Sequence, residues 1–184
     1  YGPPGTGKTT TIINLIEKYQ EVYNQQDTSL KIHLNASDER GIEVIRNQIN
    51  HFVNTKTFFT QGLKFVILDE VDYMTKNAQQ ALHYLIQQYS DNIRFCLICN
   101  YVSKIDSSLQ NEFIHLRFSQ LPETDVFTFL KNIIEKEQIN ISDDNIKAII
   151  SLFKSDIRSM INFIQGNHDD GGLNVNIMTD TKWQ

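Results

Sequence analysis

The sequence predicts an α/β fold in which helices flank a parallel sheet and a small helical domain follows. Three observations carry this prediction. A glycine-rich loop at 2–9 leads directly into a segment whose apolar residues recur with helical spacing. An apolar run at 65–68 ends in two acids, Asp69 and Glu70, which is typical of a buried parallel strand with chemistry at its carboxyl end. After Pro122 the apolar spacing is helical throughout.

Strands and helices alternate through the first part of the chain, which favours a parallel sheet joined by crossover helices. The predicted strands are 30–35, 65–69, 93–99 and 114–118, and the predicted helices of this part are 8–23, 42–53, 75–89 and 105–110. Further helices are predicted at 123–138, 143–154 and 156–165, with Ser142 and Ser155 as N-caps. We therefore expect a core at 1–120, a helical lid at 121–165 and a polar, poorly ordered tail at 166–184.

The composition is that of an ordinary globular protein, with 40% hydrophobic and 21% charged residues among 184. The sequence shows no signal peptide and no apolar stretch long enough to cross a membrane, so we expect a soluble intracellular protein. The net charge is −5, and any contact with nucleic acid must therefore come from a local basic stripe. Tyr1 stands directly before the phosphate loop, and we expect the chain to be a fragment of a longer protein.

The loop fits the phosphate-binding pattern G-x-x-x-x-G-K-[ST] at every fixed position. Its glycines let backbone N–H groups turn toward phosphate oxygens, and the next helix presents its positive end. Lys8 is expected to contact the β- and γ-phosphates, and the Thr9 hydroxyl to reach Mg²⁺. The expected nucleotide-binding residues of this segment are Gly2, Pro3, Pro4, Gly5, Thr6, Gly7, Lys8, Thr9 and Thr10. A simple glycine-rich turn is the alternative, which the acidic motif downstream disfavours.

The two acids that follow the apolar run, Asp69 and Glu70, supply a candidate metal ligand and a candidate base. Asp69 is placed to hold Mg²⁺, directly or through water, and Glu70 is the candidate base that polarises the attacking water. Asp72, two residues later, could instead cap a helix. Together with the phosphate loop, the pair indicates hydrolysis of a nucleoside triphosphate. Cys96 and Cys99 form a C-x-x-C, but no second cysteine pair exists to complete a four-cysteine metal site, and we expect two reduced, buried thiols.

These motifs stand in the order found in small subunits of replication factor C, which the chain resembles from residue 1 to about 165. The most specific are Asn-Ala-Ser-Asp-Glu-Arg-Gly-Ile at 35–42 and Phe-Cys-Leu-Ile-Cys-Asn-Tyr at 95–101. The resemblance implies an AAA+ ATPase core with a helical lid, and ATP and Mg²⁺ as cofactors. It also implies a hetero-pentameric ring with other clamp-loader subunits, acting on a sliding clamp and primer–template DNA, in the nucleus if the host is a eukaryote.

The resemblance also implies roles for single residues. Asn100 matches the sensor that reads the γ-phosphate or the attacking water, and Arg158 matches the lid arginine that touches the phosphates. With Lys8 and Glu70, these two residues form the expected catalytic set. Asn35 matches a polar residue that can hold the glutamate inactive until DNA arrives. A strand-end turn residue and a charged helix turn are the alternatives for Asn100 and Arg158.

The helix that starts near Gly41 matches the family's DNA-tracking helix. Arg40, Gly41 and Arg46 are the expected phosphate contacts, which would make binding sensitive to salt and blind to sequence. A solvated helix face is the alternative for both arginines.

Two segments depart from the family's pattern. Small subunits usually carry Ser-Arg-Cys before a strand that ends in Arg-Phe, and the arginine is the finger donated to the neighbour's ATP. Here the segment reads Asn-Glu-Phe, so that Glu112 stands where the arginine belongs, unless the register differs and Arg117 acts. A carboxylate there predicts a subunit that cannot activate the next site, or a next subunit without a working site. His83 and Tyr84 replace a common basic pair, and we expect His83 to be an exposed helix residue.

Two other functions compete with a clamp loader. Another AAA+ DNA machine, such as a branch-migration motor or a helicase loader, is disfavoured by the run at 35–42. A ring scaffold that binds ATP without hydrolysing it is disfavoured by the intact Glu70.

Overall fold

The computed structural model describes residues 1–184 except 26, 38–41, 56–61, 92, 155 and 168–184. The chain divides into two compact units. The first comprises Tyr1–Gly2 with Gly7–Arg117, and the second comprises Pro3–Thr6 with the chain from Phe118 onward.

The first unit is built on a parallel sheet. In its described residues the strands are β1 (Lys31–Asn35), β2 (Lys64–Asp69) and β3 (Ile93–Leu97), in the order β1-β2-β3. The helices are α1 (Lys8–Val22), α2 (Ile42–Asn54), α3 (Lys76–Tyr89) and the short α4 (Ser107–Gln110), with 3₁₀ turns η1 (Thr28–Leu30), η2 (Val71–Tyr73) and η3 (Val102–Lys104). The predicted parallel sheet with crossover helices is confirmed, and the 3₁₀ turns are additional elements of this unit.

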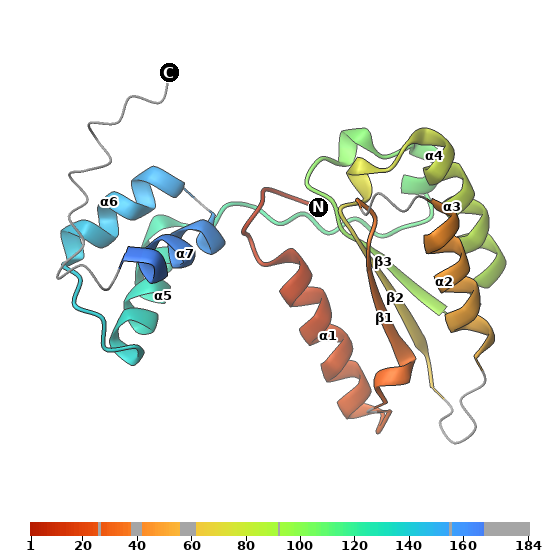
Figure 1. Ribbon diagram of the computed structural model, residues 1–184, viewed down its shortest axis with the longest axis horizontal. Helices are drawn as coiled ribbons and strands as arrows, with labels where there is room; N and C mark the ends of the chain where they lie inside the picture. The colour runs from red at the N-terminus through yellow and green to blue at the C-terminus, as the bar shows by residue number, and fades with distance from the viewer. Residues whose placement is uncertain (26, 38–41, 56–61, 92, 155, 168–184) are drawn as a thin grey trace. The chain divides into compact units, whose positions relative to one another are not determined.

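Helices cover both faces of this sheet, with α1 on one side and α2 and α3 on the other (Figure 1). The central strand β2 is therefore buried on both faces, and its alternate residues enter different clusters. Phe65 and Ile67 pack with Ile16 of α1. Val66 and Leu68 pack with residues of α2 and α3. This arrangement explains the unbroken apolar run of β2, because a strand covered on both faces has no solvent side on which polar residues are favoured.

The register of the strands places the predicted polar residues at one edge. Asn35 pairs with Asp69, and Leu68 pairs with Leu97. Because parallel strands end at the same edge of a sheet, Asp69, Glu70 and the segment after β3 lie together there.

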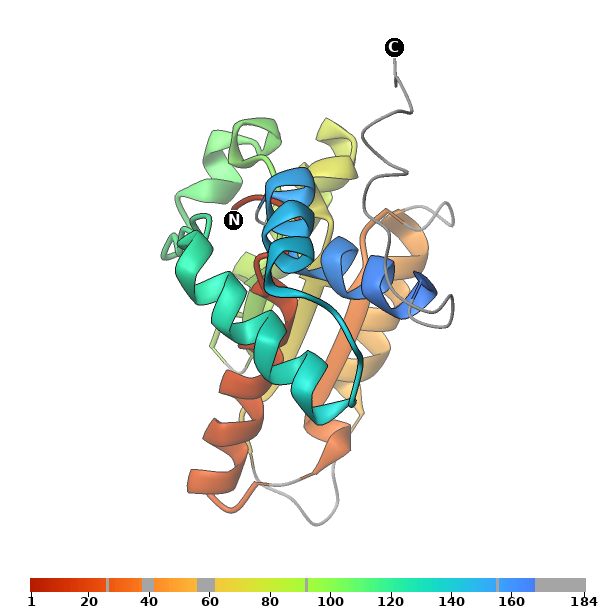
Figure 2. The ribbon, with the colours of Figure 1, turned by 90° about the vertical axis from the view of Figure 1, so that its left-hand side faces the viewer.

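The regular structure described in the second unit is helical. It contains α5 (Glu123–Lys136), α6 (Asp143–Phe153) and α7 (Ile157–Asn167), which pack against one another (Figure 2). Leu130, Ile149 and Met160 contribute one fully buried side chain from each helix. Ser142 caps α6 by accepting a hydrogen bond from Asn145 N at 3.3 Å, as predicted. The predicted cap Ser155 lies outside the described residues, and Asp156 accepts from Ser159 N at 3.1 Å at the start of α7.

Two predicted strands are corrected by the structure. Residues 114–118 were expected to form a strand but are irregular, and Ile114 is 92% exposed. A strand requires a neighbour with which to exchange hydrogen bonds, and in the described part of the chain Leu116 O accepts from the amino group of Tyr1, without a ladder. The third strand ends at Leu97, so Asn100 lies three residues beyond it rather than at its end.

The helices offer no candidate for a membrane span: none in the described ranges is both long and apolar enough.

Candidate nucleotide site

The glycine-rich loop has the backbone conformation that its sequence requires. Gly5 has φ 70° and Gly7 has φ 79°, in the left-handed region that side chains disfavour. Gly7 is the N-cap of α1, and its carbonyl accepts the hydrogen bond of Thr11 N at 2.9 Å. Since Gly7 has no side chain to cap the helix, the first amides of α1 remain open to an anion. The loop therefore fits the predicted phosphate site.

Lys8 joins this loop to the segment after β3. Its ammonium donates to Gly2 O at 2.9 Å and to the side-chain oxygen of Asn100 at 2.8 Å, and the residue is 9% exposed. A buried lysine is costly unless its charge is hydrogen-bonded, and these acceptors offset that cost. The structure thus brings together two predicted residues that lie 92 positions apart.

Thr9 and Asp69 form the second contact across the site. The Thr9 hydroxyl donates to Asp69 Oδ2 at 2.6 Å, and Asp69 Oδ1 accepts from Glu70 N at 2.9 Å. A hydroxyl and a carboxylate are hard oxygen donors of the kind that Mg²⁺ prefers. This donor set therefore fits the predicted metal pair.

Glu70 occupies an unusual backbone conformation. Its φ is 58° and its ψ is 36°, a left-handed geometry that costs a residue with a side chain about 1–2 kcal/mol. Neighbouring hydrogen bonds hold the turn, among them that from Val71 N to Ile98 O at 3.1 Å. Strain of this kind is concentrated at functional sites, where the surroundings determine the conformation. The side chain is half-buried at the edge where Asp69 ends β2.

Sequence reasoning missed two residues at this edge. Asp72 is not a helix cap: its carboxylate is buried and accepts from the backbone N of Asn100 at 3.4 Å and of Tyr101 at 3.3 Å. His33 of β1 places Nε2 3.8 Å from Asp69 Oδ2. Both contacts depend on strand register, and the signal that could have found them is the alignment of predicted strand ends.

Asn35 lies beside Asp69 in the register, and its side chain is engaged locally. Its oxygen accepts from Ser37 N at 2.9 Å and from Ser37 Oγ at 2.8 Å. Its predicted action on Glu70 stays a prediction.

Arg158 and Arg46 are the remaining predicted site residues that the structure describes. Arg158 is exposed on α7 in the second unit, and Arg46 is exposed on α2. Arg40 and Gly41 lie outside the described residues. The predicted roles of these four residues stay predictions.

Comparison with known proteins agrees with this geometry. Residues 1–121 match the model of the ATPase family associated with various cellular activities, or AAA. The chain belongs to the AAA family. A RuvB chain of Thermotoga maritima has a similar fold, with a TM-score of 0.62 at 16% identity over 89% of this chain and 51% of that one. The predicted AAA+ fold class is confirmed.

Replication factor C subunits are among the similar proteins. Human replication factor C subunit 5 is 43% identical over 91% of this AAA chain, subunit 3 of Saccharomyces cerevisiae is 41% identical over 90%, and small subunit 2 of Pyrobaculum aerophilum is 44% identical over 90%. These alignments cover 49%, 48% and 51% of the respective relatives, so the chain spans about half their length. The resemblance expected from the motifs is confirmed.

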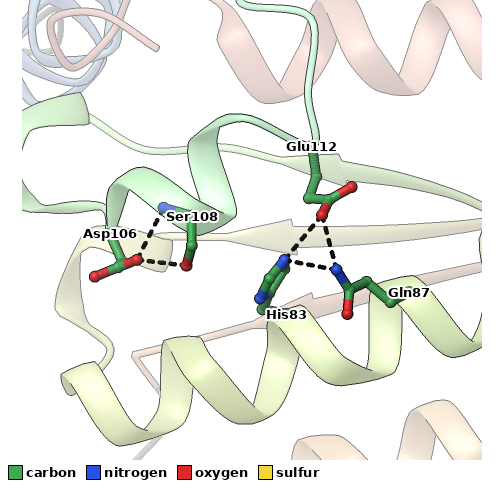
Figure 3. A network of polar contacts seen from close by, with 5 residues as sticks. All are labelled: His83, Gln87, Asp106, Ser108 and Glu112. Atoms are coloured by element: carbon green, nitrogen blue, oxygen red, sulfur yellow. Dashed lines mark hydrogen bonds and ion pairs between the residues drawn. The ribbon is translucent and has the colours of Figure 1, made fainter.

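The segment that departs from the family's pattern is fixed to α3 (Figure 3). Glu112 Oε1 lies 2.9 Å from His83 Nε2 and accepts from Gln87 Nε2 at 3.0 Å. The hydrogen bonds from His83 and Gln87 lower the pKa of Glu112. Our expectation for His83 is wrong in one respect: the residue is half-buried and engaged, not free on the helix surface. The nearby Asp106 caps α4 by accepting from Ser108 N at 2.9 Å.

Both cysteines of this AAA chain are free thiols. Cys96 is half-buried on β3 and Cys99 is buried beyond its end. Burial raises the pKa of both thiols, which therefore favour the protonated form. No group of three or more His, Cys, Asp or Glu side chains that could hold a metal ion occurs among the residues placed in the structure.

Proposed function

We propose that this protein binds ATP with Mg²⁺ and hydrolyses it as one subunit of a clamp loader. The observation that carries the ATPase part is the pair of contacts from the loop, Lys8 to Asn100 and Thr9 to Asp69. They join a cation, a hydroxyl, a carboxylate and an amide, the side chains that phosphate, Mg²⁺ and an attacking water require. The clamp-loader part is supported by relatives named as replication factor C subunits.

Each residue of the site has a distinct task in this proposal. The loop amides and Lys8 bind the phosphates, and Thr9 and Asp69 hold the metal. Bound Mg²⁺ would supply positive charge that polarises the phosphoryl oxygens. Glu70 orients the attacking water and accepts its proton, and Asn100 reads the γ-phosphate. Arg158 is assigned a contact with the nucleotide phosphates, as the resemblance to replication factor C implies.

The proposed partners follow from the relatives. They are the other subunits of a hetero-pentameric ring, a sliding clamp, and primer–template DNA bound through its phosphates. The DNA contacts proposed are Arg40, Gly41 and Arg46 near the start of α2, where a helix N-terminus and cations attract phosphate without reading bases. In a eukaryotic host the ring would work in the nucleus.

Glu112 stands where small subunits of replication factor C usually carry the arginine that acts on the ATP of the adjacent subunit. A carboxylate near a neighbour's γ-phosphate repels charge where an arginine would stabilise it. We therefore propose that the subunit hydrolyses its own ATP when a neighbour supplies an arginine, but does not activate the adjacent site.

Substituting Glu70→Gln in this subunit alone, within the full-length ring, tests the proposal. The amide keeps the shape of the side chain but cannot accept the proton, so ATP turnover at this site should fall at least about a hundredfold, at the lower end of general-base contributions. Binding of ATP with Mg²⁺ should remain. The matched control is Glu135→Gln, an exposed residue of α5. Unchanged turnover at this site would favour the scaffold that binds ATP without hydrolysing it.

A further inference from the structure

Asp72 carries a buried carboxylate that none of the roles above employs. The residue lies in η2 and is 5% exposed. Oδ1 accepts from Asn100 N at 3.4 Å, and Oδ2 accepts from Tyr101 N at 3.3 Å, both at the long end of the range for such bonds. A carboxylate is costly to bury unless its oxygens are satisfied. The two amides account for its burial, and they belong to the segment that carries the sensor.

The turn that holds Asp72 also holds Glu70 in its left-handed conformation. Such a conformation persists when the surrounding structure determines it from several sides. On the backbone, Val71 N donates to Ile98 O at 3.1 Å, and Ile98 N donates to Leu68 O at 2.8 Å. The Asp72 carboxylate adds a side-chain attachment further along both segments. The turn after β2 and the segment after β3 are thereby joined at successive points.

We infer that Asp72 is a positioning residue, whose carboxylate fixes the sensor Asn100 relative to Glu70 and Lys8. Asn100 is held from two directions: its backbone N donates to Asp72, and its side-chain oxygen accepts from Lys8 at 2.8 Å. Asp72 acts through Asn100 and contacts no nucleotide itself. The catalytic consequence rests on the proposed function, whereas the structural attachment does not.

The test is Asp72→Asn in this subunit of the full-length ring. Asparagine keeps the size of the side chain but turns an NH₂ group toward one backbone amide, so one of the two bonds is lost. We expect kcat at this site to fall about tenfold, the effect of losing one hydrogen bond to a charged group. KM should stay within about twofold, because the loop, Thr9 and Asp69 are untouched. The matched control is Asp106→Asn, the same change at the cap of α4, where the amide oxygen can still accept from Ser108 N, and it should change neither constant.

A double-mutant cycle separates positioning from a general loss of stability. If Asp72 acts through Asn100, then Asp72→Asn combined with Asn100→Ala should lower kcat no further than Asn100→Ala alone. Effects that multiply would overturn the inference, as would a rise of KM with unchanged kcat in the Asp72→Asn single variant.

Amide hydrogen exchange of the full-length protein supplies an arm that needs no ATPase activity. In Asp72→Asn the amide that loses its acceptor, that of Asn100 or of Tyr101, should exchange faster, while that of Ile98, which bonds to Leu68 O, should not change. Faster exchange throughout β2 and β3, or failure of the variant to fold, would overturn the inference in favour of a role in core stability. Should the wild-type ring hydrolyse no ATP, the proposed function fails and this arm still decides the role of Asp72.

Discussion

Two polar clusters join distant segments of the chain: the nucleotide edge, formed by Lys8, Thr9, Asp69 and Asn100, and the Glu112 turn, formed by Glu112 with His83 and Gln87. They differ in whether their charged groups remain suited to binding a ligand. At the nucleotide edge, Lys8 and Thr9 reach Asn100 and Asp69 with chemistry suited to a phosphate and a metal. At the turn, the carboxylate of Glu112 is bonded to α3 of the same chain through His83 and Gln87. The chain thus keeps the residues of the proposed nucleotide site, but has a carboxylate at the position proposed to serve a neighbour.

The largest expected effect comes from restoring the cation with Glu112→Arg. Arginine fingers contribute roughly 10³–10⁵ in rate, and a gain toward the lower of these values is expected at the adjacent site. His83 and Gln87, which bind the Glu112 carboxylate, offer no carboxylate that would pair with the new guanidinium. ATP turnover should be measured in full-length rings in which only the adjacent subunit keeps its catalytic glutamate.

Glu112→Gln is the matched control, because it removes the negative charge without adding a positive one. It should recover only the part of the rate that repulsion suppresses. If Glu112→Arg leaves turnover unchanged, Glu112 does not occupy the finger position; Arg117→Ala would then test the alternative register.

A smaller effect is expected at the nucleotide edge from Lys8→Ala. The variant removes a buried cation that would otherwise bind phosphate oxygens, and charge-assisted hydrogen bonds contribute about 1.5–3 kcal/mol. Affinity for ATP with Mg²⁺ should therefore fall about tenfold to a hundredfold, as measured by calorimetric titration of the full-length protein. Lys18→Ala, at an exposed lysine paired with Glu21, is the control and should bind as wild type. Equal affinities for both variants would place the phosphates elsewhere.

The sequence predicted the sheet and the nucleotide edge because local patterns specify them. The apolar run at 65–68 reflects burial on both faces, and the order of motifs places Lys8, Asp69 and Asn100 at one edge. Prediction from the sequence was wrong where a secondary-structure element depends on a neighbour that is distant in the chain. Residues 114–118 alternate like a strand but form no ladder in the described structure.

Contacts between side chains that are distant in the sequence were not predicted either. The contact between His83 and Glu112 joins residues 29 positions apart, and the bonds of Asp72 depend on how β3 aligns with the turn after β2. No spacing in the sequence specifies either one. A departure from a family pattern, as at Glu112, identifies a position of interest but does not predict which residues its side chain contacts.

The smallest expected effect concerns the stability that Glu112 itself contributes. Hydrogen bonds from His83 and Gln87 lower its pKa from the ordinary 4.5, so its ionised form is favoured by folding. This contribution is fully present above the unfolded value and is lost as the pH falls through the lowered folded value. The urea midpoint of the full-length protein should therefore exceed that of Glu112→Gln near neutral pH, and the difference should shrink in acid. Glu135→Gln, at an exposed residue, should show no such trend; a difference independent of pH would mean that the contact with α3 does not depend on the charge of Glu112.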